Sequence, residues 1–263
     1  MKEDIELKTT EEVDAIRAAA SVVELVLAHL RQSIIPGRST SSVEAQCAAL
    51  LTRHNAMPES SQTGGFPAAA CISVNNVIAH GIPGDYVLAE GDIVTVDVTA
   101  CVNGWYADGA WTYVAGTPSD ESLRLIQAAW SCTMSGLRAA HAGGRLGDIG
   151  AAVQQTAHQL HCSVLAEFAG HGIGRRMHES PTVLHEAEQG TGLPVVPGLV
   201  FTVEPIVCFG TPTTRKLDDG WTYVADDGTR TAQFEHTIAI FSRRTEILTM
   251  SNALQYVDFP PFF

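Results

Sequence analysis

Two short stretches with the same pattern constrain this chain more than any other feature. They are Gly91-Asp-Ile-Val-Thr-Val-Asp97 and Gly198-Leu-Val-Phe-Thr-Val-Glu204. Each has a glycine, then an apolar run with β-branched residues, then a carboxylate, a pattern typical of a buried strand. A carboxylate at the end of such a strand points inward or into a cleft, where its charge is costly unless it binds a cation or is neutralised. We therefore expect a duplicated fold with an acidic site at its centre.

The charge of the chain narrows the class of ligand. The 263 residues include 29 acidic and 16 basic ones, a formal net charge of −13. Nucleic-acid binding requires a basic surface, so this charge argues against it. The same charge is compatible with cationic ligands such as metal ions or free amino termini.

Targeting signals and a cysteine framework are not expected. The chain has no apolar run of about eighteen residues, and its first residues lack an apolar signal core, so we expect a cytoplasmic protein that does not bind membranes. The six cysteines are scattered without a Cys-x-x-Cys pair, which excludes a zinc ribbon or a thioredoxin-type motif and favours free buried thiols.

Helical and strand patterns occur twice in the same order. Apolar spacing predicts helices at 10–35, 41–55, 120–141 and 148–161. Apolar and turn patterns predict strands at 70–74, 105–114, 163–167 and 200–208, and a hairpin joining 221–225 to 233–241. We expect an α+β fold that forms one domain over residues 1–263. Its pseudo-halves, at about 10–114 and 118–241, enclose a mixed or antiparallel sheet covered by helices on one side.

A hairpin predicts the first part of the acidic site. Asn103-Gly104 between two apolar runs is a strong signal for a two-residue turn. This turn pairs Thr99 with Asp108 and places both on the same face as Asp97. The two aspartates are then diagonal neighbours, about 7–8 Å apart. We favour a metal-bound pair because Asp97 ends an apolar strand, and an exposed pair on a solvated face is the alternative.

Further candidate ligands follow later in the chain. His171 and His178 lie in one glycine-rich segment, and either could bind a metal or donate a hydrogen bond to a reacting carbonyl. Glu204 precedes Pro205 at the end of the second apolar run, and Glu235 follows in the last predicted strand. Each glutamate alone is compatible with a structural ion pair. Together, four carboxylates and an imidazole suit Mn, Fe(II), Co or Zn, with enough negative charge for two ions about 3.5–4 Å apart.

Seven motifs occur in an order that is known from one family. They are Ser73-Val-Asn, Ala79-His-Gly-Ile-Pro83, Gly91-Asp-Ile-Val-Thr-Val-Asp-Val98, Gly170-His-Gly-Ile-Gly174, His178-Glu179, Phe201-Thr-Val-Glu-Pro205 and Gln233-Phe-Glu-His-Thr237. With them, the chain resembles the methionine aminopeptidases over nearly its whole length. The resemblance implies the pita-bread fold, a curved and mostly antiparallel sheet in two pseudo-twofold halves. The short interval between Glu204 and Glu235, and the lack of an N-terminal zinc-binding extension, make the chain similar to the compact bacterial type I enzymes.

The resemblance also implies a site with two divalent ions (Co, Mn, Fe(II) or Zn). The implied ligands are Asp97, Asp108, His171, Glu204 and Glu235. In such a site Glu204 takes a proton from the attacking water and returns it to the leaving amine. His178 donates to the scissile carbonyl oxygen, and His80 positions the substrate near the scissile nitrogen. For His80, the neighbouring Gly81 and Pro83 leave a simple turn as the alternative.

The implied pocket for the methionine side chain departs from the family pattern. It maps onto Thr63, Phe66, Cys71, Met177 and Trp221. The family usually has an aromatic residue where Thr63 and Met177 stand. Met177 is a soft, adaptable side chain that can still line such a pocket, and a shifted substrate range is therefore compatible with the sequence.

The function that the resemblance implies is removal of the initiator methionine, preferentially before a small second residue. We expect a monomer that acts on peptide or nascent-protein N-termini, with the ribosome as a partner to consider and no direct nucleic-acid or membrane binding. One alternative is a proline-specific aminopeptidase or dipeptidase of the same fold, although these usually carry an extra N-terminal domain. The other is a binding protein that keeps the fold without the chemistry, which loss of ligands would mark.

Overall fold

The structure is a computed structural model that describes residues 5–58, 65–211 and 213–250. The helices of the described residues are α1 (Thr10–Leu30), the 3-10 turn η1 (Arg31–Ser33), α2 (Thr40–Arg53), α3 (Asp120–Ala139) and α4 (Leu146–Gln159). The strands of the first half are β1 (Met57–Pro58), β2 (Cys71–Val74), β3 (Val77–Ala79), β4 (Asp92–Val102) and β5 (Trp105–Ala115). Those of the second half are β6 (Ser163–Val164), β7 (Gly170–Gly172), β8 (Glu179–Val183), β9 (Val200–Val203), β10 (Ile206–Cys208), β11 (Thr214–Lys216), β12 (Tyr223–Ala225), β13 (Thr231–Gln233), β14 (His236–Ile240) and β15 (Thr245–Ile247).

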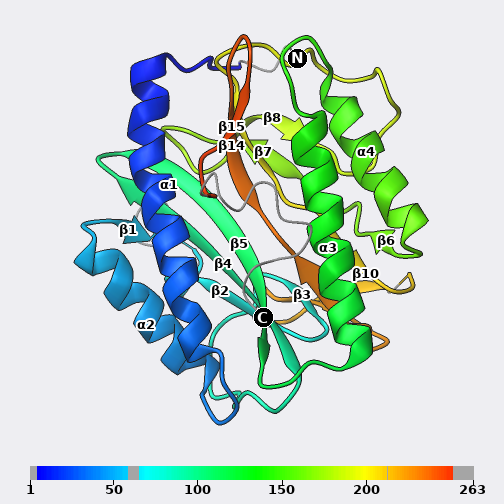
Figure 1. Ribbon diagram of the computed structural model, residues 1–263. Helices are drawn as coiled ribbons and strands as arrows, with labels where there is room; N and C mark the ends of the chain where they lie inside the picture. The colour runs from blue at the N-terminus through cyan, green and yellow to red at the C-terminus, as the bar shows by residue number, and fades with distance from the viewer. Residues whose placement is uncertain (1–4, 59–64, 212, 251–263) are drawn as a thin grey trace.

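The helices cover one side of the strands, as the sequence predicts. In Figure 1, α1 and α2 lie beside β4 and β5, whereas α3 and α4 lie beside the strands of the second half. Every strand pair among the described residues is antiparallel. The α+β class is therefore confirmed, with antiparallel pairing. Within the described ranges, no helix combines the length and the apolar character that crossing a membrane requires.

The hairpin of β4 and β5 has the predicted register. Thr99 lies opposite Asp108, as the two-residue turn requires. Asn103 and Gly104 have φ angles of 52° and 77°, the left-handed conformations that a type I′ turn demands. The turn therefore fixes which residues of these two long strands face the same side as Asp97.

Two predictions about strands in the second half are wrong. The strand expected at 200–208 is divided by Glu204 and Pro205, because β9 pairs with β14 and β7 while β10 pairs with β13 and β6. The chain thus passes from one sheet to another at Glu204. The hairpin expected between 221–225 and 233–241 does not form either. Both edges of β12 are occupied by β11 and by β3 of the first half, and a turn signal cannot reveal such a distant partner.

An aromatic cluster centred on Phe234 joins the two halves of the chain. Phe234 is 0% exposed, and its ring packs edge-to-face against Trp111 of β5 at 5.0 Å and Trp130 of α3 at 5.3 Å between centroids. Edge-to-face aromatic pairs add stabilisation beyond the area that they bury. The cluster also fixes the residue that immediately precedes Glu235.

Replacing Phe234 by Ala should lower the free energy of unfolding by about 3–5 kcal/mol, because it leaves a cavity between two tryptophans. The measurement is urea denaturation of the metal-free protein, followed by circular dichroism. Phe241→Ala is the matched control, since Phe241 is only partly buried and packs against the Arg244 guanidinium. Equal losses for the two variants would contradict the role of the cluster.

Candidate metal centre and adjoining pocket

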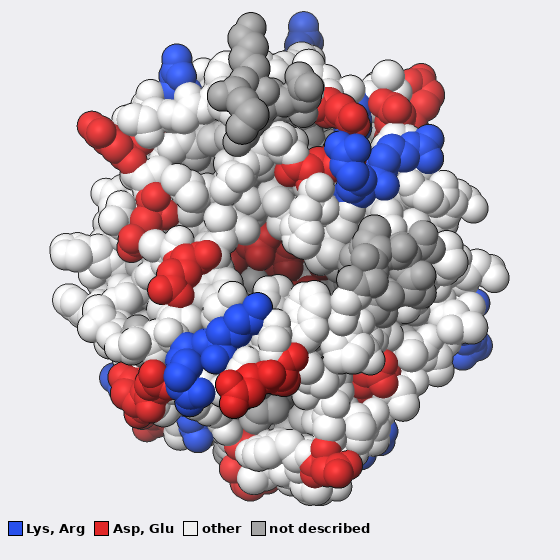
Figure 2. Space-filling view, turned by 180° about the vertical axis from the view of Figure 1, so that it is seen from behind, with Lys and Arg blue, Asp and Glu red and all other residues white. Residues whose placement is uncertain are grey.

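The five side chains expected as metal ligands line one open cleft of about 700 Å³. They are Asp97 of β4, Asp108 of β5, His171 of β7, Glu204 after β9 and Glu235 before β14. Figure 2 shows acidic residues at the bottom of a hollow on the face opposite to the helices. Strands from both halves of the chain therefore converge on the acidic site, as the repeated pattern predicts.

The atoms that a metal would contact lie close together. His171 Nε2 is 3.6 Å from Glu204 Oε1 and 4.0 Å from Asp108 Oδ2. One possible ligand atom each from Asp108, His171 and Glu235 lie within 4.8 Å of one another. This spacing matches donors arranged around a cation rather than side chains that merely share a surface.

The carboxyl groups resist ionisation in this arrangement. Burial raises the pKa of Asp97 and of Glu235 well above the usual range, and repulsion from Asp108 adds to both shifts. Burial likewise raises the pKa of Asp108, and that of Glu204 to about 8. Since desolvation and like charges both favour the neutral form, the cluster stays fully charged only beside a compensating cation.

The residues present fit a divalent metal ion. Glu235 is 1% exposed, and its Oε1 atom is buried without a hydrogen-bond partner within the described part of the chain. A buried carboxylate oxygen without a partner is costly unless a cation binds it. Carboxylate oxygens with a single imidazole form a donor set that hard or borderline divalent ions accept.

His171 is oriented for ligation by its own backbone. Its Nδ1–H donates to the Gly172 carbonyl at 3.0 Å, so the Nε2 lone pair faces the carboxylates. An outer hydrogen bond of this kind is usual for metal-binding histidines. The preceding Gly170 permits this close packing, because any side chain there would collide with the Thr202 carbonyl.

Two residues that the sequence did not reveal hold Glu204 in place. The Thr202 hydroxyl donates to Glu204 Oε1 at 2.6 Å and accepts from the His171 N–H at 3.0 Å. His185 Nε2 accepts from the Glu204 N–H at 3.0 Å, and its Nδ1–H donates to the Phe168 carbonyl at 3.3 Å. Burial lowers the pKa of His185 to about 4, so the ring is neutral and can accept. Thr202 could have been found from its place two residues before Glu204 on a strand, whereas His185 has no local signal.

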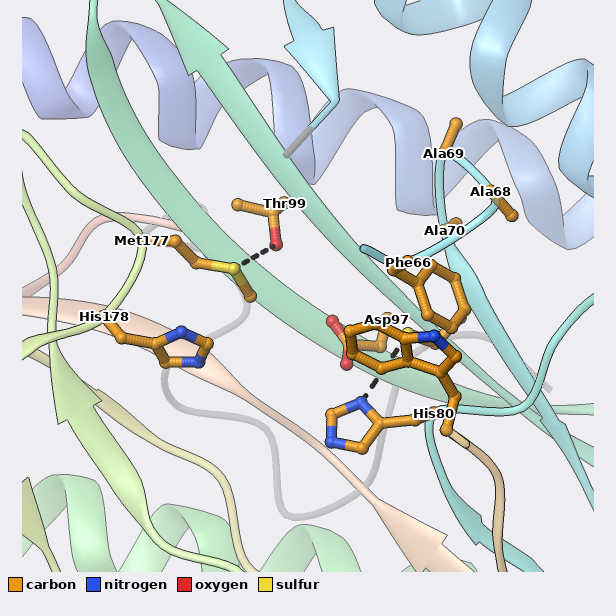
Figure 3. A pocket seen from close by; sticks show the side chains of 11 residues that line it. Phe66, Ala68, Ala69, Ala70, His80, Asp97, Thr99, Met177 and His178 are labelled. Carbon is orange, nitrogen blue, oxygen red and sulfur yellow. Dashed lines mark hydrogen bonds between the residues drawn. The ribbon is translucent and has the colours of Figure 1, made fainter. Parts of the chain in front are cut away.

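A second cavity of about 220 Å³ adjoins the acidic cleft (Figure 3). The predicted pocket residues Phe66, Cys71, Met177 and Trp221 all line it, while Thr63 lies outside the described residues. Its other lining residues are Ala68, Ala69, Ala70, His80, Asp97, Thr99 and His178. Because Asp97, His80 and His178 line both cavities, the apolar pocket opens directly beside the acidic site.

The walls of the pocket are held by specific contacts. Phe66 and Trp221 pack edge-to-face with 5.5 Å between ring centroids. On the opposite side of the pocket, the Thr99 hydroxyl contacts the Met177 sulfur at 3.8 Å (Figure 3). Met177 is thus tethered to β4, and Ala68, Ala69 and Ala70, whose side chains are small, also line the pocket.

The two remaining predicted histidines face the junction of the cavities. His80 has a φ angle of 53°, uncommon for a residue other than glycine, and its Nδ1 lies 3.9 Å from the Cys71 sulfur. The His178 ring lies 4.3 Å from that of His171. Burial lowers the pKa of both His80 and His178. Both rings are therefore neutral near pH 7 and able to donate one N–H bond.

Comparison with known proteins agrees with this arrangement. Residues 14–241 match the model of metallopeptidase family M24. The chain is 38% identical to the methionine aminopeptidase of Rickettsia prowazekii, over 98% of this chain and 99% of the relative. It is 39% identical to that of Clostridium perfringens, over 93% of this chain and 98% of the relative. The crystal structure of the Rickettsia prowazekii methionine aminopeptidase superposes with a TM-score of 0.91 at 39% identity, covering 94% of this chain and 100% of that one.

The chain belongs to metallopeptidase family M24. Within that family it is similar to methionine aminopeptidases over nearly its whole length, which confirms the resemblance and the pita-bread fold expected from the motifs. The use of divalent metal by this family agrees with the cluster of Asp108, His171 and Glu235.

Thr202→Val should weaken divalent metal binding about 10- to 100-fold, because it removes the hydroxyl that bridges Glu204 and His171 while keeping the shape of the side chain. The measurement is calorimetric titration of the metal-free protein with Mn²⁺. Thr156→Val on α4 is the control, since that hydroxyl bonds only to the Ala152 carbonyl at 2.9 Å among the described residues. Unchanged affinity in Thr202→Val would show that the bridge does not organise the site.

Proposed function

We propose that this protein is a methionine aminopeptidase that removes the N-terminal methionine of peptides and nascent proteins, preferentially before a small second residue. The observation that carries the proposal is the convergence of an acidic, imidazole-containing cluster and an apolar pocket at Asp97. The M24 family match and the methionine aminopeptidases among the relatives support the same activity.

We further propose that two divalent metal ions bind the cluster, with Co, Mn, Fe(II) and Zn as candidates. Their ligands would be Asp97, Asp108, His171, Glu204 and Glu235. Divalent ions supply Lewis acidity, which lowers the pKa of water and polarises a carbonyl. Four carboxylates carry enough charge to balance two such ions.

The chain orients its substrate through the junction of the cavities. A methionine side chain in the apolar pocket, between Phe66 and Met177, brings its amino group next to Asp97. The acidic surroundings attract a protonated amino terminus. Because the acidic site lies directly beside the apolar pocket, a residue whose side chain fills the pocket has its amino group in the acidic site, which accounts for an exopeptidase.

Three side chains then handle protons and charge. Glu204, whose buried carboxyl group is ionised only beside a compensating cation, then accepts a proton from the attacking water and returns it to the leaving amine. His178 donates its N–H to the scissile carbonyl oxygen as negative charge develops there. His80, on the opposite side of the junction, donates near the scissile nitrogen and fixes the peptide's direction.

The remaining expectations belong to the same proposal. Residues 1–263 are taken as one catalytic domain, because the cluster draws side chains from both pseudo-halves. The protein is proposed to act in the cytoplasm as a monomer, on peptide and nascent-protein N-termini, with the ribosome as a partner during synthesis. Its charge of −13 argues against direct nucleic-acid binding.

Hydrolysis of Met-Ala-Ser and Ala-Pro-Ala tests the proposed function. Metal-free protein should release methionine from Met-Ala-Ser after addition of Mn²⁺ or Co²⁺, and a chelator should abolish the release, as measured by amino-acid chromatography. Cleavage of Ala-Pro-Ala alone would indicate a proline-specific peptidase. Failure to cleave either peptide with metal bound would favour a binding protein.

Glu204→Gln should lower kcat about 10²- to 10⁴-fold, because an amide cannot accept the proton. Circular dichroism and metal content should be measured on the same sample, since Glu204 is also a proposed ligand. Glu167→Gln is the matched control in the same cleft, where Glu167 is exposed. Full turnover by a folded, metal-loaded Glu204→Gln protein would exclude Glu204 as the base.

A further inference from the structure

A small sheet at the edge of the cleft carries a row of paired residues. In the order β11, β12, β3, Lys216 lies opposite Tyr223, and Tyr223 lies opposite Ala79. Directly opposed residues point to the same face of a sheet. Since Tyr223 and Ala79 both line the cleft, Lys216 belongs to the cleft face and continues its wall outward.

An aromatic contact holds the Lys216 ammonium over this wall. Its Nζ lies 5.5 Å from the centre of the Tyr223 ring, within the range of a cation–π interaction. The Tyr223 ring in turn packs edge-to-face on Phe168 at 5.3 Å and lies 6.1 Å from His80. The charge of Lys216 also affects His80, at the junction of the two cavities. Burial is the main cause that lowers the pKa of His80, and His178 and Lys216 add to the shift.

Lys216 is free to bind a ligand carboxylate. Its side chain is exposed, and within the ranges that the structure describes it forms no ion pair. The nearby Asp219 carboxylate instead accepts backbone N–H bonds from Trp221 and Thr222, at 2.8 and 2.9 Å. Figure 2 shows basic side chains at the rim of the acidic hollow. Glu167 is exposed in the same cleft without an ion pair to Lys216.

The spacing of the strands indicates which substrate residue passes Lys216. The proposed function places the scissile nitrogen beside His80, which directly follows Ala79. Two strand spacings separate Ala79 from Lys216, about 10 Å. An extended peptide covers roughly 3.3–3.6 Å per residue, so the second or third residue after the scissile bond reaches the ammonium.

We propose that Lys216 is a specificity-determining residue that favours substrates with an acidic side chain at the third or fourth position. This inference rests on the proposed function and deepens it. A carboxylate there pairs with the ammonium at the cleft rim, while the substrate amino terminus lies in the acidic centre. The protein would thus recognise a positive charge at the substrate's amino terminus and a negative charge two or three residues later.

Amidated peptides of the form Met-Ala-Xaa-Xaa-Ala, with Xaa as Glu, Gln or Lys, test the inference on the metal-loaded protein. At low ionic strength, kcat/KM for the Glu peptide should exceed that for the Gln peptide about three-fold, the range of an exposed ion pair. The ratio should fall towards one in about 1 M salt, where the screening length is only about 3 Å. Lys216→Gln should bring the ratio to one even at low salt, and Lys216→Glu should reverse the preference towards the Lys peptide.

Arg215→Gln is the matched control. Arg215 is the neighbour of Lys216 on β11, but it faces the other side of the sheet, where it pairs with Asp226 at 2.6 Å. Its substitution by Gln removes the same charge from the protein. This variant should retain the three-fold ratio. A ratio that survives Lys216→Gln, or that Arg215→Gln abolishes equally, overturns the inference.

The two proposals fail in different ways. If no peptide of the series releases methionine in the presence of metal, the proposed function fails. If all three release methionine at equal rates at low salt, the methionine aminopeptidase stands and the role of Lys216 is excluded. Thermal denaturation of each variant confirms that the fold is intact in every comparison.

Discussion

Repulsion among four carboxyl groups buried at the bottom of the cleft is the constraint on which the rest of this structure depends. Burial and mutual repulsion raise the pKa values of Asp97, Glu204 and Glu235, so without a cation the cluster holds protons that a metal must displace. Metal binding and proton release are therefore linked, and affinity falls as the solution becomes more acidic. The repelling carboxylates would move apart if their backbones were free. Strands from both halves of the chain hold these backbones in place.

Neutral hydrogen bonds provide that fixation. The Thr237 hydroxyl bonds both backbone groups of Asp108, at 3.0 Å from its N–H and 2.8 Å from its carbonyl. Thr202 and His185 hold the carboxylate and the backbone of Glu204 in the same way. Uncharged partners restrain Asp108 and Glu204 without neutralising their charge, so these carboxylates stay available to a cation. Removing such restraints is expected to weaken binding more than it weakens the fold, because each supports one local geometry.

Local patterns predicted those parts of the molecule that local physics determines. The Asn103-Gly104 turn fixed the register of β4 and β5, and the apolar strands located Asp97 and Glu204. The partners of β12 were not predictable, because β3 lies about 140 residues earlier and no turn connects them. The role of His185 was not predictable for the same reason. It arises from contacts with Phe168 and Glu204, which only the folded chain brings together.

The small sheet of β11, β12 and β3 carries a different set of residues of the site from the larger sheets. It supports His80 and the adjoining Trp221 and carries Tyr223 and Lys216, whereas the described acidic and imidazole donors come from the neighbouring, larger sheets and the loops beside them. On the proposed role of Lys216, substitutions on β11 would change which N-termini are preferred without moving the proposed metal-binding residues. By the same reasoning, a β11–β12 ribbon transplanted into another enzyme of this fold would transfer its charge selectivity to that enzyme.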